Sequence, residues 1–152
     1  MAYTSAEARQ DLLDAFAEAI EHIGVALADL GAAYELVDER NGDRLEEELF
    51  GPVQRAYGRA KRTYAQSADR HGMTGQTFAT PSPGLPSTGA KGLIDSAVGS
   101  VAQADGALSG LQDSSLPTEV GDTELRAAVT NVRELLGGVR QRAREIERTL
   151  GR

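Results

Sequence analysis

The chain has 152 residues, of which 40% are apolar and 26% are charged, and its net charge is −7. This length suits a single domain over residues 1–152 with one sizeable core. The absence of cysteine excludes disulfides, thiolate nucleophiles and cysteine-ligated metal centres.

The first segment carries an apolar seam whose members alternate by three and four positions, the spacing of one helix face. The seam runs through Leu13, Phe16, Ile20, Ile23, Leu27, Leu30, Tyr34 and Val37. Thr4 with Glu7 fits a capping box at its start, and Asn41-Gly42 is a turn dipeptide suited to its end. We therefore expect one helix over about residues 5–40.

A second helix is expected over about residues 43–71. Asp43 is suited to cap its start, and the three glutamates of residues 46–48 favour the positive end of the helix dipole. Gly51-Pro52 interrupts the pattern. Because proline lacks a donor and clashes with the preceding turn, we expect a kink there.

The composition changes to Gly, Ser, Thr and Pro over residues 72–89, where Pro81, Pro83 and Pro86 forbid a regular helix. At about 3.3–3.6 Å per residue, this loop reaches roughly 60 Å when extended, enough to cross a helical bundle. The third helix is therefore free to run in either direction relative to the second.

Two further seams of the same spacing follow the loop. One runs through Ile94, Ala97, Val101, Ala104, Leu108 and Leu111, and the other through Leu125, Val129, Val132, Leu136, Val139, Ala143, Ile146 and Leu150. They predict helices over about residues 90–112 and 122–150. Because each seam needs an apolar partner, the sequence predicts an all-α fold, an antiparallel four-helix bundle with coiled-coil-like packing, in which the Pro/Gly-rich loop joins two long helical hairpins.

Charge is spread unevenly along the chain. Residues 1–50 carry 13 acids against 3 bases, whereas residues 51–72 carry 1 against 5. Folding the first hairpin about Asn41-Gly42 predicts the pairs Arg62–Glu21, Arg55–Asp29 and Arg70–Asp14. We therefore interpret the basic and aromatic run of residues 54–64 as neutralised by the first helix, and expect no nucleic-acid partner.

Glycines recur every seventh residue within the predicted helices, at a cost of up to about 1 kcal/mol each relative to alanine. They are Gly24, Gly31, Gly51, Gly58, Gly92, Gly99 and Gly106. Close approach of neighbouring helices is one explanation, and a surface for a partner helix or a second copy is the other. Because the third-helix glycines fall off its seam, Gly92, Gly99 and Gly106 are our candidate interface.

Catalytic and metal-binding motifs are sparse. Alanine stands three residues before both His22 and His71, so the Glu-x-x-His motif of di-iron bundles is absent. The sequence also lacks a Gly-rich phosphate-binding loop. We therefore expect no catalytic residue, no metal site and no cofactor.

One pattern of acidic residues favours a metal-dependent enzyme instead. Glu18-x-x-Glu21 followed by Glu35-x-x-Asp38 resembles the acidic spacing of all-helical MazG-type nucleotide pyrophosphohydrolases. In that family the two pairs converge from separate helices and hold magnesium against a triphosphate. Here Glu21 and Glu35 are expected on one helix, roughly 21 Å apart at about 1.5 Å per residue, which favours a solvated face.

The sequence favours a non-catalytic bundle that acts by protein–protein interaction or self-association, with a protein partner or a second copy. The excess of arginine over lysine suggests a bacterial source, and the lack of a signal sequence or an 18-residue apolar stretch a cytoplasmic protein without a membrane partner. Besides the nucleotide hydrolase, the alternative is a small apolar ligand bound near the kink. The candidate pocket residues are Phe16, Tyr34, Tyr57 and Tyr64.

Overall fold

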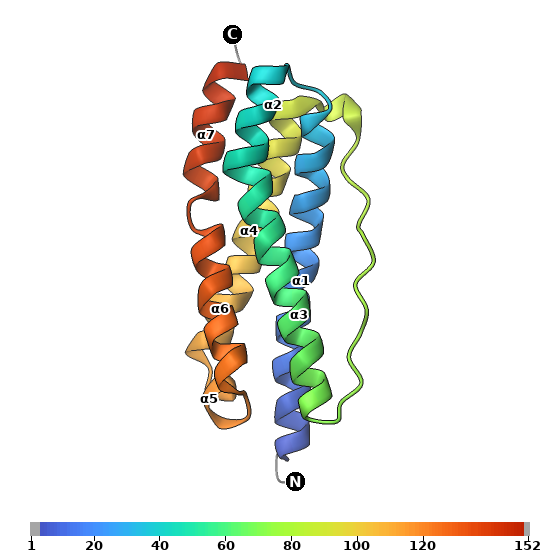
Figure 1. The fold of residues 1–152 in the computed structure, drawn as a ribbon, viewed down its shortest axis with the longest axis vertical. Helices are drawn as coiled ribbons and strands as arrows, with labels where there is room; N and C mark the ends of the chain where they lie inside the picture. The colour runs from blue at the N-terminus through green and yellow to red at the C-terminus, as the bar shows by residue number, and fades with distance from the viewer. Residues whose placement is uncertain (1–3, 151–152) are drawn as a thin grey trace.

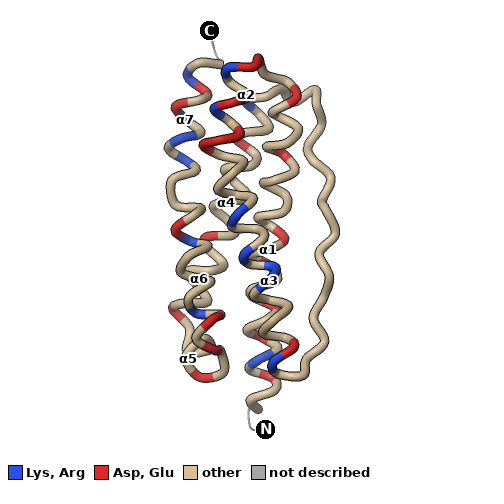
Figure 2. The backbone as a smooth tube through the Cα atoms, in the orientation of Figure 1, with Lys and Arg blue, Asp and Glu red and all other residues tan. Residues whose placement is uncertain are grey.

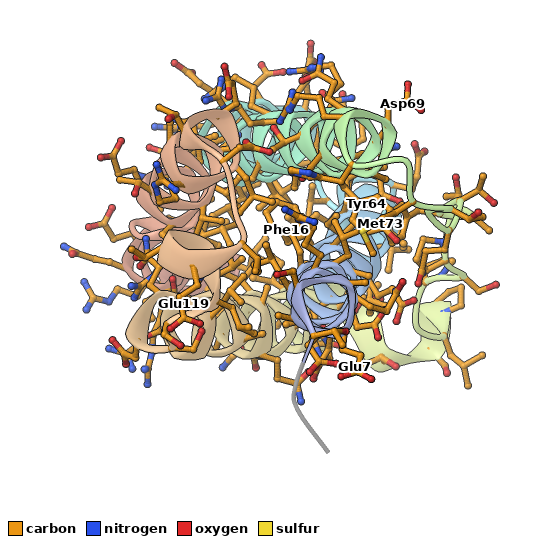
Figure 3. The ribbon with its side chains drawn as sticks, turned by 90° about the horizontal axis from the view of Figure 1, so that it is seen from below. Glu7, Phe16, Tyr64, Asp69, Met73 and Glu119 are labelled. Carbon is orange, nitrogen blue, oxygen red and sulfur yellow. The ribbon has the colours of Figure 1, made fainter. Side chains whose placement is uncertain are left out.

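The computed structural model describes residues 4–150, and this part of the chain contains helices and no strand. The all-α prediction is thus confirmed. The helices lie side by side along one axis in two layers (Figures 1 and 3). The first layer contains α1 (Ser5–Tyr34) and α4 (Gly89–Asp113), and the second contains α2 (Glu39–Leu45), the π-helix Glu46–Phe50, α3 (Gly51–Arg70), α6 (Thr123–Leu136) and α7 (Val139–Leu150). The short helices are the 3-10 turn Pro86–Thr88 and α5 (Leu116–Glu119).

The direction of each helix can be followed by colour in Figure 1. Helix α1 rises from the N-terminal end of the molecule, and α2, the π-helix and α3 return. Residues 71–85 then travel back along the length of the molecule, so that α4 descends and α6 and α7 rise. Helices α3 and α4 therefore run in the same direction, which the sequence had left open, and α1 packs antiparallel to α4 and to α3.

The core is one cluster of apolar side chains drawn from all the long helices. Phe16, Ile20 and Ile23 of α1 are fully buried, as the seam predicted. Burying a side chain of this size contributes about 1.5–3 kcal/mol. Tyr34 is 41% exposed, because α1 ends at this residue and leaves it at the rim of the core.

The predicted boundary between the first two helices is wrong. Helix α1 ends at Tyr34, not near residue 40, and Asn41-Gly42 lies inside α2. The reason is the cap at Asp38, whose Oδ1 accepts a hydrogen bond from the backbone N–H of Asn41 at 2.8 Å. This cap starts α2 at Glu39, so the turn lies at residues 35–38, earlier in the chain than Asn41-Gly42.

The kink expected at Gly51-Pro52 takes the form of a wider helical turn, the π-helix Glu46–Phe50 that precedes it. Pro52 cannot donate a hydrogen bond to the preceding turn. The carbonyl of Glu48 in that turn instead accepts a hydrogen bond of 2.9 Å from Nε of Arg142 on α7. A Cβ atom at Gly138 would crowd the Arg142 guanidinium, so a side chain there would displace the end of the arginine.

The long connection over residues 71–85 is fastened to the helices at several points. Asp29 of α1 is only 2% exposed, and its carboxylate accepts hydrogen bonds of 2.7 Å from the Gly84 backbone N–H and from the Ser96 hydroxyl. The Phe78 ring packs edge-on against Tyr64, with 5.1 Å between ring centroids. The predicted pair Arg55–Asp29 is therefore wrong, because Asp29 faces this connection and α4.

Candidate functional site

A groove of about 590 Å³ runs between α3 and α6 on the second layer. Its walls are Gln54, Arg55, Gly58, Arg59 and Arg62 of α3 and Asn131 and Leu135 of α6. The three arginines follow the spacing i, i+4, i+7 and therefore share one face of α3. We call this feature the arginine groove.

Two glycines make room for these arginines over the helix surface. A Cβ atom at Gly58 would lie 3.1 Å from Nη1 of Arg62, and one at Gly51 would lie 3.2 Å from the Glu46 carbonyl oxygen and 3.4 Å from Nη1 of Arg55. Each glycine thus stands one helical turn before an arginine whose guanidinium folds back over it. A side chain at Gly58 would press on Arg62, and one at Gly51 would press on the Glu46 carbonyl of the π-helix, so neither glycine reflects close approach of a neighbouring helix.

The positive charge of the arginine groove is not neutralised by acidic side chains of residues 4–150. Among residues 4–150 no ion pair and no side-chain hydrogen bond involves Arg55, Arg59 or Arg62. Nε of Arg59 is shielded from solvent and has no hydrogen-bond partner in that range. A buried donor without a partner costs about 1–3 kcal/mol, so an acceptor placed in the groove would be stabilised there.

The predicted neutralisation by the first helix is wrong at the remaining two pairs as well. Glu21 accepts a hydrogen bond of 2.9 Å from the Gln76 side chain, and not from Arg62. Arg70 forms an ion pair of 2.8 Å with Asp122, and not with Asp14. Both differences arise because the connection over residues 71–85 and α6 take the positions that the simple hairpin assigned to charged partners.

Asp122 lies at the α3–α6 interface, at the end where α6 begins. It caps α6 by accepting from the Leu125 N–H at 2.7 Å, and it also accepts from the Ser67 hydroxyl at 3.2 Å. Burial raises the pKa of Asp122, but the hydrogen bonds from Arg70, Leu125 and Ser67 outweigh it and lower the pKa below its usual value. Arg70 and Asp122 therefore join the end of α3 to the start of α6. The arginines of the groove lie earlier in α3 and take no part in this ion pair.

Helix α1 carries the opposite charge on its outer face. Its exposed carboxylates are Glu7, Asp11, Asp14, Glu18 and Glu21. We call them the acidic stripe, since they too alternate by four and three and share one helix face. Figure 3 shows Glu7 on the outer side of α1, in the layer away from α3 and α6, and Figure 2 shows basic residues gathered midway along α3. The two charged surfaces belong to different layers.

The candidate interface glycines lie on α4, in the same layer as the acidic stripe. A Cβ atom at Gly99 or Gly106 would meet no other atom within 4 Å, whereas one at Gly92 would collide with the Thr88 side chain. Close helix approach therefore does not explain Gly99 or Gly106 within one chain. Gly24 instead makes room for side chains, since a Cβ there would lie 3.1 Å from the Tyr57 ring and 3.2 Å from Cγ of Pro81.

The four candidate pocket residues do not meet in one cavity. Phe16 and Tyr64 are buried in the core with 6.5 Å between their ring centroids. Tyr57 lines a hollow beneath the connection over residues 71–85. Tyr34 lines a separate hollow at the end of α1, beside Phe50.

The acids of the MazG-like pattern also stay apart. Glu18 and Glu21 lie on the exposed face of α1, Glu35 follows its last turn, and Asp38 caps α2. Within residues 4–150, no three His, Cys, Asp or Glu side chains are grouped closely enough to hold a metal ion.

Over residues 4–150, none of the helices has both the length and the apolar character that a bilayer crossing requires. Searches for related proteins found no matching family, no matching curated protein and no matching solved structure.

Proposed function

We propose that the chain is a four-helix bundle, two long hairpins joined by the crossing Pro/Gly-rich connection, that acts in the cytoplasm by self-association and without catalysis. In this assembly the arginine groove of one copy receives the acidic stripe of another. The observation that carries the proposal is the groove itself, whose three arginines have no acidic partner within residues 4–150.

The spacing of the two surfaces supports this pairing. Arg55, Arg59 and Arg62 span seven residues, or roughly 10 Å at about 1.5 Å per residue. Asp14, Glu18 and Glu21 repeat the same steps of four and three along α1. Arginine and carboxylate form bidentate pairs, each worth about 0–1 kcal/mol where solvent reaches them, and complementary charge also steers association.

The location of the two surfaces determines the kind of assembly. Because the arginine groove and the acidic stripe lie on different layers, the contact joins two unlike surfaces, and it produces a ring or an open chain of copies. The open backbone at Gly99 and Gly106 lies in the same layer as the stripe. Together with Gly92, these glycines make α4 the flat part of the proposed interface.

Light scattering coupled to size-exclusion chromatography tests the proposal. At low salt we expect a mass above the 16.1 kDa of one chain, and at about 1 M salt, where the Debye length is about 3 Å, a monomer. The double variant Arg59→Glu with Arg62→Glu should associate at least tenfold more weakly at low salt. The matched control, Arg40→Glu with Arg148→Glu, makes the same charge change at exposed positions of α2 and α7 and should associate like the wild type.

A charge exchange makes the experiment specific. The variant Asp14→Arg with Glu18→Arg should also be monomeric alone, and mixing it with the arginine-groove variant should restore a complex. At α4, Gly99→Glu should weaken association, whereas Gly99→Ala should keep it and raise helix stability by up to about 1 kcal/mol. A wild-type chain that is monomeric at low salt and high concentration contradicts the proposal.

A further inference from the structure

A second hollow lies at the far end of α1, away from the arginine groove. It has a volume of about 290 Å³, and it is lined by Gly31, Tyr34 and Glu35 at the end of α1 and by Glu46 and Phe50 of the π-helix. We call it the α1-end hollow. Because π-helical turns in proteins are frequently found at functional sites, its position is notable.

Two aromatic rings provide the walls of this hollow. Tyr34 is 41% exposed and Phe50 is half-buried. Within residues 4–150 neither ring takes part in an aromatic pair or stacks with a cation, unlike Tyr57, whose ring lies 4.0 Å from Nζ of Lys61. Gly31 lies beside the Phe50 ring, where a Cβ atom would make an ordinary van der Waals contact of 3.8 Å with Cε2.

The electrostatics of the α1-end hollow are negative. The side-chain carboxylates of Glu35 and Glu46 form no ion pair and no hydrogen bond within residues 4–150. The last turn of α1 contains no basic residue, and Glu35 occupies its C-cap. Because the C-terminal end of a helix carries about half a negative charge, an acid there adds to a potential that a cation normally offsets.

From these three features we infer that the α1-end hollow binds a small organic ammonium ion. The rings of Tyr34 and Phe50, which line the hollow, suit a quaternary or alkylated ammonium group through cation–π contact. The carboxylates of Glu35 and Glu46, with the end of the α1 dipole, supply the opposite charge. This ligand differs in class from the apolar molecule that the aromatic residues alone suggested, and the inference does not depend on self-association.

Titration followed by two-dimensional NMR of the amide groups tests the inference with a matched pair of probes. Choline and 3,3-dimethylbutan-1-ol have the same shape, but only choline carries a positive charge. We expect choline to cause saturable shifts at the amides of Gly31 and Phe50, and the neutral alcohol to bind at least tenfold more weakly. Equal binding of the two probes, or choline shifts that do not saturate or that occur elsewhere, would overturn the inference.

Variants assign the contributions of the two chemistries. Glu46→Gln should weaken choline binding about threefold to tenfold, and Phe50→Leu should weaken it by a similar factor. Glu47→Gln, an exposed neighbour that does not line the hollow, is the matched control and should bind like the wild type. Since Glu46 is exposed, its variant tests the inference even if Phe50→Leu does not fold, and unchanged binding in Glu46→Gln also counts against it.

Discussion

Two carboxyl groups at the interface of α4 and α7 show how a pair of residues makes this fold sensitive to pH. Burial and the neighbouring Asp95 carboxyl raise the pKa of Glu147 to about 7, while Lys91 and Arg144 act in the opposite direction. Arg140 also lines this small hollow. Glu147 therefore keeps its proton to near neutral pH in the folded chain, whereas an unfolded glutamate releases it near pH 4.5.

The consequence for stability has a definite sign. Because the folded pKa of Glu147 is raised, its contribution is fully present below about pH 4.5 and is lost as the pH rises through about 7. Glu147→Gln, which cannot ionise, should therefore be more stable than the wild type at pH 8 and similar to it at pH 4.5. Because solvent reaches the pair, we expect a gain of less than about 1 kcal/mol, measured by chemical denaturation at both pH values.

The control for this prediction is Glu145→Gln, an exposed position on the same helix. It removes the same charge without touching Asp95, and it should show no such difference between the two pH values. A gain in Glu147→Gln that is equal at pH 4.5 and pH 8 would mean that the raised pKa of Glu147 plays no part.

The sequence alone predicts caps that form within one helical turn, but not pairs of residues that are far apart in the chain. Thr4 and Glu7 form the expected capping box, since both partners lie within one helical turn. Asp29 and Gly84 are 55 positions apart, and no local pattern relates them. The basic run is visible in the sequence, but whether its arginines have acidic partners depends on where α6 and the long connection lie.

At the scale of whole elements, the seams located the helical segments because apolar burial repeats with the helical period. The single helix expected over residues 122–150 is wrong, since the segment is divided into α6 and α7 at Gly137-Gly138. The exact boundary between α1 and α2 was not predictable in the same way. Both Asp38 and Asn41-Gly42 are good turn formers, and only the tertiary structure selects the cap at Asp38. The π-helix before Pro52 was likewise visible only as an expected irregularity.

The π-helix and α7 depend on each other through Arg142 and Pro52. Arg142→Met should lower the free energy of unfolding by about 1–2 kcal/mol, because the Glu48 carbonyl loses the hydrogen bond from Nε. In a Pro52→Ala background the new backbone N–H can serve the preceding turn, so the same substitution should cost at least about 0.5 kcal/mol less. Denaturant titration of the four proteins of this cycle measures the coupling.

Arg140→Met provides the matched control, since Arg140 is an exposed arginine of the same helix. It should cost the same in both backgrounds. If Arg142→Met is equally destabilising in the wild-type chain and in the Pro52→Ala chain, the hydrogen bond to the Glu48 carbonyl does not compensate for the proline.

At the scale of the whole molecule, the connection over residues 71–85 sets the direction of α4. Asp29 is one of the residues that hold this connection against the helices. The apolar pattern of a helix says which face is buried but not which way the helix runs, so the parallel direction of α3 and α4 could not be predicted. A buried carboxylate that accepts two hydrogen bonds joins α1, the connection and α4 at one point.

Removing that carboxylate should loosen the connection first. Asp29→Ala is expected to lower the free energy of unfolding by about 2–3 kcal/mol, because hydrogen bonds to a charged group are among the stronger ones. It should also speed chymotrypsin cleavage near Phe78 at least severalfold. The exposed Asp14→Ala is the control, and unchanged cleavage in Asp29→Ala would show that other contacts hold the connection.

The same crossing connection imposes a delay on the chain as it is made. Helix α1 packs most extensively against α4, yet 54 residues separate the end of α1 from the start of α4. At about 5–20 residues per second, a ribosome needs roughly 3–11 s to synthesise that interval. During this time the apolar seam of α1 is without its main partner. Newly made chains are therefore exposed to chaperones and to aggregation for longer than those of a bundle whose helices pair in sequence order.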